Sequence, residues 1–439
     1  MRIKKASTTS KSCFHSIVCI YVLSILTLSG CQQITSVPKS TELSGSQETS
    51  IQITEQPVVS CQKPVEVLEP QQHYSLPGAL VYSSLGDFRL VGGTPLTVQR
   101  LPTTEPSAGS LNMIGFSPSG EWFAYYTGSV PEAIPFKVHL ISAGGEKVTT
   151  RPEYEFVPDQ EETSAGMWVN ARWIAENRLI VSIPEPEENN PDKVIRVILD
   201  PFTGEWFETI LENIPEPYAH GDFTFDPNLR YVFYRANLEA GKGTKTPATV
   251  LWDLENEKEL WQSETLFYPY AAASAAVWAP DGSMVAFVGP EVTTASVNGG
   301  RDSYGVYVLD LDSLKPRLIT DFLSIYRSFS VSGLSWSPDG RYLAFRLVGE
   351  KISEGVTEEV IYLYDSVISD VIDLCPVIGE SGVSVIRGLV WSPDSRYLAY
   401  VSDHFPSDRA LLVIDVQTGT VSALAQSVGE LGGWSGIFH

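Results

Sequence analysis

A short motif that recurs along most of the chain constrains the fold more than any other feature. An aromatic residue followed by Ser-Pro-Asp-Gly, or a close variant, returns every 52 to 58 residues, at positions 116–120, 173–177, 225–229, 278–282, 336–340 and 391–395. Each copy precedes an alternating strand, a variable loop, a strand that ends near Asp, a tight turn and a last strand. The chain therefore repeats a unit of four strands.

The chemistry of the motif explains why the first two strands of each unit form a hairpin. Proline fixes the negative φ of the first corner, Asp or Asn suits the second, and Gly takes the left-handed position that follows. The aromatic residue before the turn is placed to pack between neighbouring sheets. Repeated four-stranded antiparallel units of this kind are typical of a β-propeller.

The two ends of the repeat region predict the number of blades. Six motifs give six blades, and residues 431–435 (Leu-Gly-Gly-Trp-Ser) look like one more first strand. Residues 77–82 look like the matching turn remnant and second strand, followed by two further strands at 87–91 and 96–101. We therefore predict an all-β, seven-bladed propeller of four-stranded antiparallel blades, closed by a blade shared between the N- and C-terminal strands. Six blades with ragged ends is the alternative.

The Trp-Ser-Pro-Asp-Gly repeats resemble those of TolB-like, WD40-like and dipeptidyl-peptidase propellers, and this resemblance covers most of residues 78–439. It implies the propeller fold. The sequence shows neither the α/β domain that precedes the TolB propeller nor a hydrolase domain after the repeats. The activities of those relatives are therefore not carried over.

The N-terminus predicts export and lipid attachment. A basic segment, Arg2 to Lys11, precedes an apolar run at 17–28 that is too short to span a bilayer. The following Leu-Ser-Gly-Cys31 resembles a bacterial lipobox, with a plain signal peptide as the alternative. We predict a signal peptide at 1–30, a disordered lipid-anchored tether at 31–72 and the propeller at 73–439. Lipidation, including palmitate, is expected on Cys31, at the outer face of the cell membrane or at the outer membrane.

The charge of the chain limits its partners. It has 53 acidic and 30 basic residues, a formal net charge of −23. Such a protein does not suit nucleic acid and is repelled by an anionic bilayer. We expect membrane contact through the lipid alone, and a monomer.

Cysteines and acidic runs give no firm metal or cofactor site. Apart from the cysteines of the signal peptide and Cys31, the sequence contains Cys61 and Cys375. These two can form a disulfide with each other or remain separate thiols. No zinc-ligand spacing occurs. The acidic runs at 159–162 and 185–192 can be calcium loops or solvated loops, and the missing EF-hand spacing favours the latter. We expect no cofactor.

The long segments of the repeats lie on one end of the predicted ring. First–second and third–fourth turns share one end, the turn end, whereas second–third and blade-to-blade loops share the other, the loop end. Long loops on a rigid scaffold usually carry function; the long segments are 127–137, 152–167, 183–193, 236–248, 263–274, 289–303 and 321–331. Aromatic residues in or near them are candidates for a binding face, although inward packing that caps a blade is the commoner fate and is favoured for each. These residues are Tyr154, Phe156, Tyr218, His220, Phe267, Tyr268, Tyr270, Phe322, Tyr326 and Phe329.

The first strands are expected to line a central channel. Their polar residues are candidates for holding a small anion between two arginines, or for a plain water-filled channel, which we favour. These residues are Asn112, Asn170, Arg172, Asp222 and Arg387.

Signatures of catalysis are missing from the sequence. There is no GxSxG elbow, P-loop, HExxH, or GxGxxG after a strand. His220 near Asp222 and His404 near Asp403 lack an evident third partner. We therefore expect a non-catalytic, lipid-anchored extracytoplasmic propeller that binds an envelope or secreted protein through its loop end. The alternatives are a solute- or glycan-binding lipoprotein and a propeller glycosidase or lyase.

Overall fold

The computed structural model describes residues 75–101, 103, 111–129, 134–142, 147–149, 170–184, 194–207, 214, 223–239, 245–264, 276–291, 303–377, 386–403 and 409–436. The chain divides into two units, 1–55 and 56–439, and every described residue belongs to the second. The predicted signal peptide and tether thus lie outside the described residues. No helix long and apolar enough to cross a membrane occurs in the described part.

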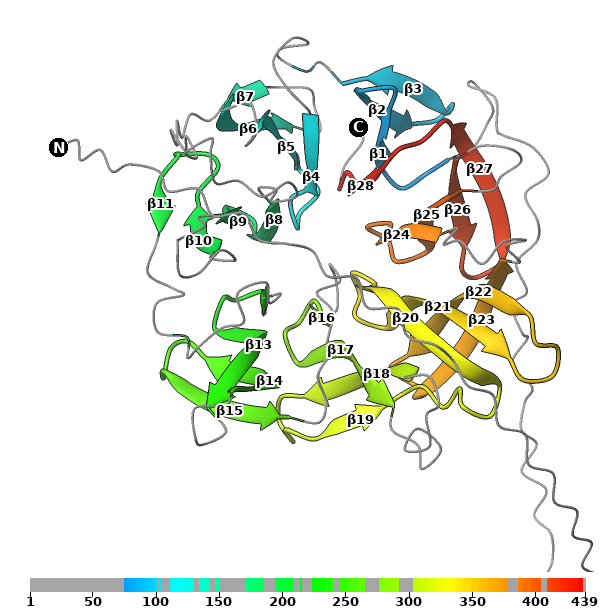
Figure 1. Ribbon diagram of the computed structural model, residues 1–439. Helices are drawn as coiled ribbons and strands as arrows, with labels where there is room; N and C mark the ends of the chain where they lie inside the picture. The colour runs from blue at the N-terminus through cyan, green and yellow to red at the C-terminus, as the bar shows by residue number, and fades with distance from the viewer. Residues whose placement is uncertain are drawn as a thin grey trace, which may run out of the picture. The chain divides into compact units, whose positions relative to one another are not determined.

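The described strands form seven four-stranded antiparallel sheets, which confirms the predicted seven-bladed all-β propeller (Figure 1). The first three blades are blade 1, with β4 (Leu111–Phe116), β5 (Trp122–Ser129), β6 (Ile134–Ser142) and β7 (Lys147–Thr149); blade 2, with β8 (Asn170–Ala175), β9 (Arg178–Pro184), β10 (Val194–Leu199) and β11 (Trp206–Phe207); and blade 3, with β12 (Phe223–Phe225), β13 (Tyr231–Glu239), β14 (Lys245–Asp253) and β15 (Lys258–Ser263).

The next three blades follow the same order, with the first strand innermost in the ring. They are blade 4, with β16 (Ala276–Trp278), β17 (Met284–Glu291), β18 (Ser303–Asp310) and β19 (Pro316–Leu318); blade 5, with β20 (Tyr326–Trp336), β21 (Tyr342–Lys351), β22 (Thr357–Asp365) and β23 (Asp370–Val377); and blade 6, with β24 (Ile386–Trp391), β25 (Tyr397–Ser402), β26 (Ala410–Asp415) and β27 (Thr420–Gln426).

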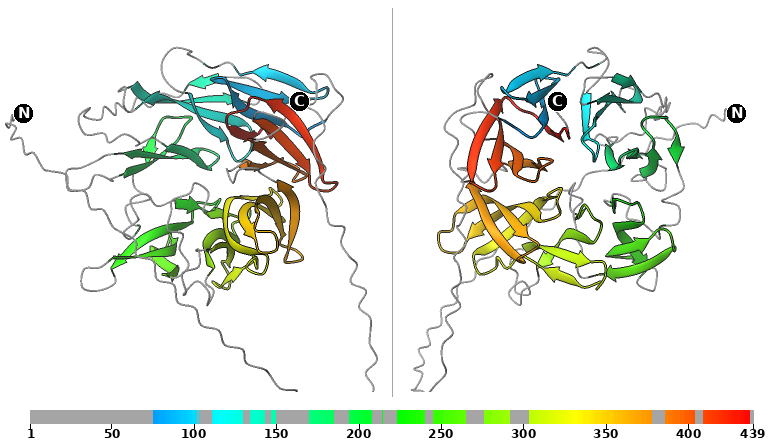
Figure 2. Two further views of the ribbon diagram at one scale, coloured as in Figure 1. Left: turned by 45° about the vertical axis from the view of Figure 1, so that its right-hand side comes forward. Right: turned by 180° about the vertical axis from the view of Figure 1, so that it is seen from behind.

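Blade 7 is shared between the two ends of the propeller sequence, as predicted. Its strand order is β28-β1-β2-β3, so the last strand of the chain is innermost (Figure 2). The strands are β28 (Leu431–Trp434), β1 (Ala79–Ser84), β2 (Asp87–Gly92) and β3 (Thr97–Arg100). β1 therefore pairs on both edges, antiparallel to β2 and to β28.

The hydrophobic core lies between the blades. Seven clusters of buried side chains occur among the described residues, and each combines two neighbouring blades, including blade 7 with blade 1. Strands in the middle of a blade are apolar on both faces for this reason; all six residues of β26 are buried. Burial between blades therefore holds neighbouring sheets together around the ring.

The repeated motif forms the predicted tight hairpin. In blade 5 the backbone N–H of Ser337 donates to Tyr342 O at 2.7 Å, and Gly340 N donates to Ser337 O at 2.8 Å. Gly340 has φ +72°, which only glycine adopts without strain. The Ser337 hydroxyl adds a bond that the sequence had not indicated, since its Oγ accepts from Tyr342 N at 2.8 Å.

The motif tryptophans join neighbouring blades by hydrogen bonds as well as by packing. In four of the five motif tryptophans, counting Trp434, the indole N–H donates to a backbone carbonyl in the first strand of the preceding blade; Trp336 is the exception among the described residues. The four bonds join Trp173 to Gly115 (3.0 Å), Trp278 to Thr224 (3.1 Å), Trp391 to Ser335 (2.9 Å) and Trp434 to Val390 (3.1 Å). The tryptophan therefore fixes the spacing between adjacent first strands, which phenylalanine at 116 and 225 cannot do.

The Asp near the end of the third strand forms an ion pair with an arginine of the first hairpin. In blade 5 Arg341 Nη2 lies 2.7 Å from Asp365 Oδ2, and Val367 N donates to Asp365 Oδ1 at 2.9 Å. Burial raises the pKa of Asp365, but the bonds from Arg341 and the backbone outweigh it, so its net pKa is lowered. Arg396 and Asp415 repeat the arrangement in blade 6. The pair links two turns at the turn end.

Several segments predicted as long loops are in part strand. Residues 127–129 and 134–137 extend β5 and β6, residues 236–239 and 245–248 extend β13 and β14, and β20 begins at Tyr326 within the expected 321–331 loop. The cross-strand pairing continues past the predicted ends because no tight turn signal interrupts it. This corrects the expected loop boundaries.

Candidate functional site

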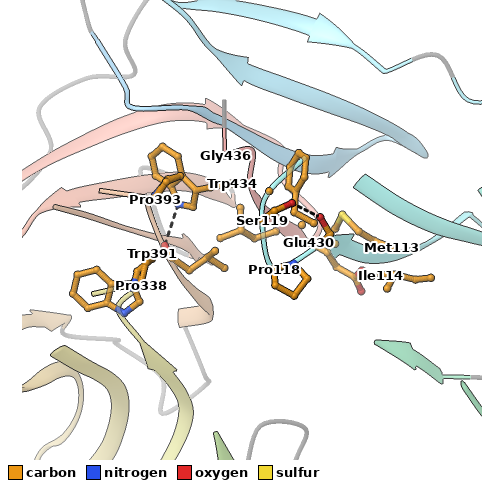
Figure 3. A pocket seen from close by; sticks show the side chains of 18 residues that line it. Met113, Ile114, Pro118, Ser119, Pro338, Trp391, Pro393, Glu430, Trp434 and Gly436 are labelled. Carbon is orange, nitrogen blue, oxygen red and sulfur yellow. Dashed lines mark hydrogen bonds between the residues drawn. The ribbon is translucent and has the colours of Figure 1, made fainter. Parts of the chain in front are cut away.

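A cavity of about 610 Å³ lies against the innermost strands of blades 1, 6 and 7 and their turns. Figure 3 shows Trp391 and Trp434 on one side of it, and Met113, Ile114 and Glu430 on the other. The remaining lining comes from Gly115, Phe116, Ser117, Pro118, Ser119, Gly120, Pro338, Val390, Pro393, Leu431, Gly432, Gly433 and Gly436.

Glycines make the walls of this cavity possible. A Cβ on Gly432 would lie 2.4 Å from Met113 Sδ, so β28 has no side chain where Met113 packs. On Gly120, a Cβ would lie 2.1 Å from Gly436 N, and Gly436 N donates to Gly120 O at 2.9 Å. The chain after β28 therefore runs directly against the first turn of blade 1. Any larger residue at these positions would push the walls apart.

Hydrogen bonds between turns stiffen the rim. Ser119 N and Oγ donate to the two carboxylate oxygens of Glu176 in blade 2, at 2.8 and 2.7 Å. On the other side, Asp339 N of blade 5 donates to Ser395 Oγ of blade 6 at 3.0 Å. Both bonds join the first turns of adjacent blades. The cavity mouth is thus built on connected hairpins.

The lining of the cavity is mixed, with apolar side chains beside Ser117, Ser119 and one carboxylate. Glu430 is the only charged residue among the described residues that line it. Its backbone is held by Ser83, because Glu430 N donates to Ser83 Oγ at 2.8 Å and Ser83 N donates to Glu430 O at 2.9 Å. Burial and the Glu430 charge together raise the pKa of Tyr126 to about 12.

This arrangement suits binding. Proline, methionine, isoleucine and tryptophan side chains offer apolar contact, and the volume falls in the range of ligand pockets, roughly 300 to 1,000 Å³. No cluster of three or more His, Cys, Asp or Glu that could hold a metal occurs in the described part of the chain.

Three of the candidate binding-face aromatics are buried, which is the outcome favoured for each of them from the sequence. Phe322, Tyr326 and Phe329 are 6%, 1% and 3% exposed. Their rings pack edge-on to one another, with Phe322 5.7 Å from Phe329 and 6.1 Å from Tyr326 between ring centroids. They fill the core between blades 4 and 5 because β20 extends into the expected loop and turns them inward.

Tyr326 belongs to a buried polar network in blade 5. Its hydroxyl lies 2.6 Å from Glu358 Oε1 and 3.1 Å from the Tyr362 hydroxyl, and Lys351 Nζ lies 2.7 Å from Glu358 Oε2. Burial raises the pKa of Tyr326, and the Glu358 bond raises that of Lys351. A Cβ on Gly349 would lie 2.6 Å from the Tyr326 ring. The network stabilises the extended end of this blade.

For the other predicted site residues, the structure describes the side chain, only the backbone, or neither. Arg172 and Asn112 lie on β8 and β4, and each has a partner. Asn170, Arg387 and Cys375 lie on strands, with their side chains outside the described structure. Outside the described residues altogether are Cys31, Cys61, Tyr154, Phe156, the acidic runs, Tyr218, His220, Asp222, Phe267, Tyr268, Tyr270 and His404.

The cavity itself was missed from the sequence. Trp391, Pro338 and Pro393 belong to the repeated motif, and they were interpreted only as turn and packing residues. Glu430 lies one residue before β28 and carries no motif. A signal was nevertheless present in Gly432 and Gly433, since adjacent glycines in a strand mark a close approach.

Fold and cavity together define a closed seven-bladed β-propeller with a pocket of mixed polarity at its hub. No protein-family model matches the sequence, and no curated protein matches it.

Several solved propellers are similar to the chain. They include an oligogalacturonate lyase in complex with manganese (14% identity over 81% of this chain and 86% of the other, TM-score 0.47). TolB from Acinetobacter baumannii is also similar (13% identity, 81% and 82%, TM-score 0.41). So is the β-propeller domain of the Trilobed protease from Pyrococcus furiosus (10% identity, 72% and 85%, TM-score 0.43). At these identities the likeness concerns the fold alone.

Proposed function

We propose that the protein is a non-catalytic, lipid-anchored extracytoplasmic propeller that binds a segment of a partner protein at its hub cavity. The observation that carries this proposal is the cavity of about 610 Å³, with walls of mixed polarity and a rim of hydrogen-bonded turns. Three of the ten candidate aromatics of the loop end are buried and the other seven lie outside the described residues, so the proposal is placed on this cavity. Partner segments bind well to rigid concave surfaces because little ordering is required of the protein.

Site-specific photocrosslinking tests the partner. A photoreactive amino acid replaces Pro338 or Pro393, two exposed residues of the cavity lining, in the full chain in its own cells. The control position is Val367, which is 74% exposed and outside the lining. We expect one protein to crosslink at 338 and 393 and to be absent at 367. Equal products at all three positions, or none at the cavity, would contradict the proposal.

Lipid labelling tests the anchor. The sequence Leu-Ser-Gly before Cys31 supports acylation of that thiol. We expect a palmitate analogue to label the wild-type protein and the Cys61→Ser control, and Cys31→Ser to lose the label and leave the membrane fraction. Label retained in Cys31→Ser would contradict the anchor without affecting the partner proposal.

A solute-binding lipoprotein is the second candidate, and the cavity volume favours it as well. It predicts saturable binding of a small molecule that blocks crosslinking at 338 and 393. If metabolite and glycan screens find no such molecule while a crosslinked protein is found, this candidate fails.

A further inference from the structure

The polar side chains that line the cavity differ in whether they already form hydrogen bonds within the protein. Ser117 Oγ and Ser119 Oγ lie 3.1 Å apart, and Ser119 is bound to Glu176. Only backbone atoms of Glu430 take part in hydrogen bonds among the described residues, and its side chain makes no ion pair there. Glu430 is exposed, so its carboxylate is available to a ligand.

The surroundings of Glu430 fit a long cationic side chain. Met113, Ile114 and Leu431 line the same cavity and are apolar. Lysine and arginine carry an apolar stem that packs on such surfaces and a charged end that seeks a carboxylate. A neutral side chain would leave the carboxylate unpaired, and an acidic one would be repelled.

The charge of the whole chain acts in the same direction. Its formal net charge is −23, which attracts cationic segments and raises their rate of encounter. The apolar side chains of Met113, Ile114 and Leu431 then contact the segment once it has arrived, while a single carboxylate fixes its register.

We infer that the hub cavity selects a segment of the partner protein that carries Lys or Arg between apolar residues, with Glu430 as the counter-ion. This inference rests on the proposed function, because it names the chemistry recognised at the same site.

Three capped peptides with a fluorescent label provide the test. They share the sequence Ala-Leu-X-Leu-Ala, where X is Lys, norleucine or Glu, so that only the charge at the centre changes. Binding to the full-length protein is followed by fluorescence anisotropy. We expect the Lys peptide to bind about fivefold more tightly than the norleucine peptide at low salt, and the Glu peptide to bind most weakly.

Glu430→Gln is the decisive variant. It keeps the side-chain shape and the backbone bonds to Ser83 but removes the charge, so the preference for Lys should vanish while norleucine binding remains. Glu121→Gln is the matched control, because Glu121 is exposed on the first turn of blade 1 and lies outside the lining. It should keep the preference.

The outcomes separate this inference from the proposed function. Equal binding of the Lys and norleucine peptides, or a preference that survives Glu430→Gln, overturns the charge selection. If crosslinking at 338 and 393 still captures a protein, the proposed function stands without the charge selection. Absence of both peptide binding and crosslinking overturns the two together.

Discussion

Ser435 Oγ accepts a hydrogen bond of 2.9 Å from the backbone N–H of Ala79, which lies 356 positions away in the sequence. Ser435 N donates in return to Ala79 O at 2.7 Å. Ser337 and Tyr342 make the same two bonds within one intact motif. Trp434-Ser435 from the end of the chain and Pro77-Gly78 from the start of the propeller therefore rebuild one copy of the repeat between them.

This relationship predicts that closure of the ring depends on Ser435. Ser435→Ala removes the acceptor of the buried Ala79 N–H, and we expect a loss of about 1 kcal/mol in the free energy of unfolding. Urea denaturation measures the free energy of unfolding of this variant and of Ser337→Ala, so that the two losses can be compared. Similar losses would show that the rebuilt motif is equivalent to an intact one; an unchanged Ser435→Ala would contradict it.

A comparison of two motif tryptophans measures how much the indole hydrogen bond contributes to stability. The Trp391 indole donates to Ser335 O at 2.9 Å, whereas Trp336 Nε1 is buried and has no acceptor among the described residues. Both lose ring volume on mutation to Phe, but only Trp391→Phe loses a hydrogen bond. We expect it to reduce the free energy of unfolding by about 1 kcal/mol more than Trp336→Phe does. The reverse order would rule out a stabilising role for the indole bond.

The Arg341–Asp365 pair predicts a dependence of stability on pH. The folded pKa of Asp365 is lowered, so its contribution is present above the unfolded pKa, about 3.9, and is lost as pH falls through the folded value. Asp365→Asn should cost about 2 kcal/mol at pH 7 and progressively less below pH 4. Unfolding curves at several pH values test this, with Asp312→Asn, an exposed turn residue, as the control. A pH-independent difference would contradict the assignment.

The buried network in blade 5 predicts that removal of a single hydroxyl lowers the free energy of unfolding. Tyr326→Phe leaves Glu358 Oε1 without its 2.6 Å donor, and bonds to charged groups are stronger than neutral ones. We expect a loss of about 2 kcal/mol in the free energy of unfolding. Tyr231→Phe is the control, since that ring stacks on Trp278 and its hydroxyl makes no hydrogen bond in the described part. Equal effects of the two changes would argue against the network.

The fold was predictable because its determinants are local and repeated. Pro338 and Gly340 specify a turn by their own backbone preferences, and the same pattern recurs along the chain. The shared blade followed from counting strands at both ends.

The site was not predictable, because it depends on contacts between distant segments. Met113 and Gly432 are neighbours only once the ring has closed, and Glu430 becomes a cavity residue by the same event. For the loop aromatics, burial was the outcome favoured from the sequence, and Phe322 and Phe329 are buried. The core that they enter depends on the length of β20, which no turn signal in the sequence marks.

The shared blade also sets the order of events during synthesis. β1 is among the first strands to leave the ribosome, and its pairing partner β28 is among the last. The edge of β1 stays open through the growth of six intervening sheets, so the ring cannot close before β28 has been made. Completion of the hub cavity, with Glu430, Leu431 and Trp434 in its walls, therefore waits until β28 has been made. A truncated product can contain six blades and still have no binding pocket.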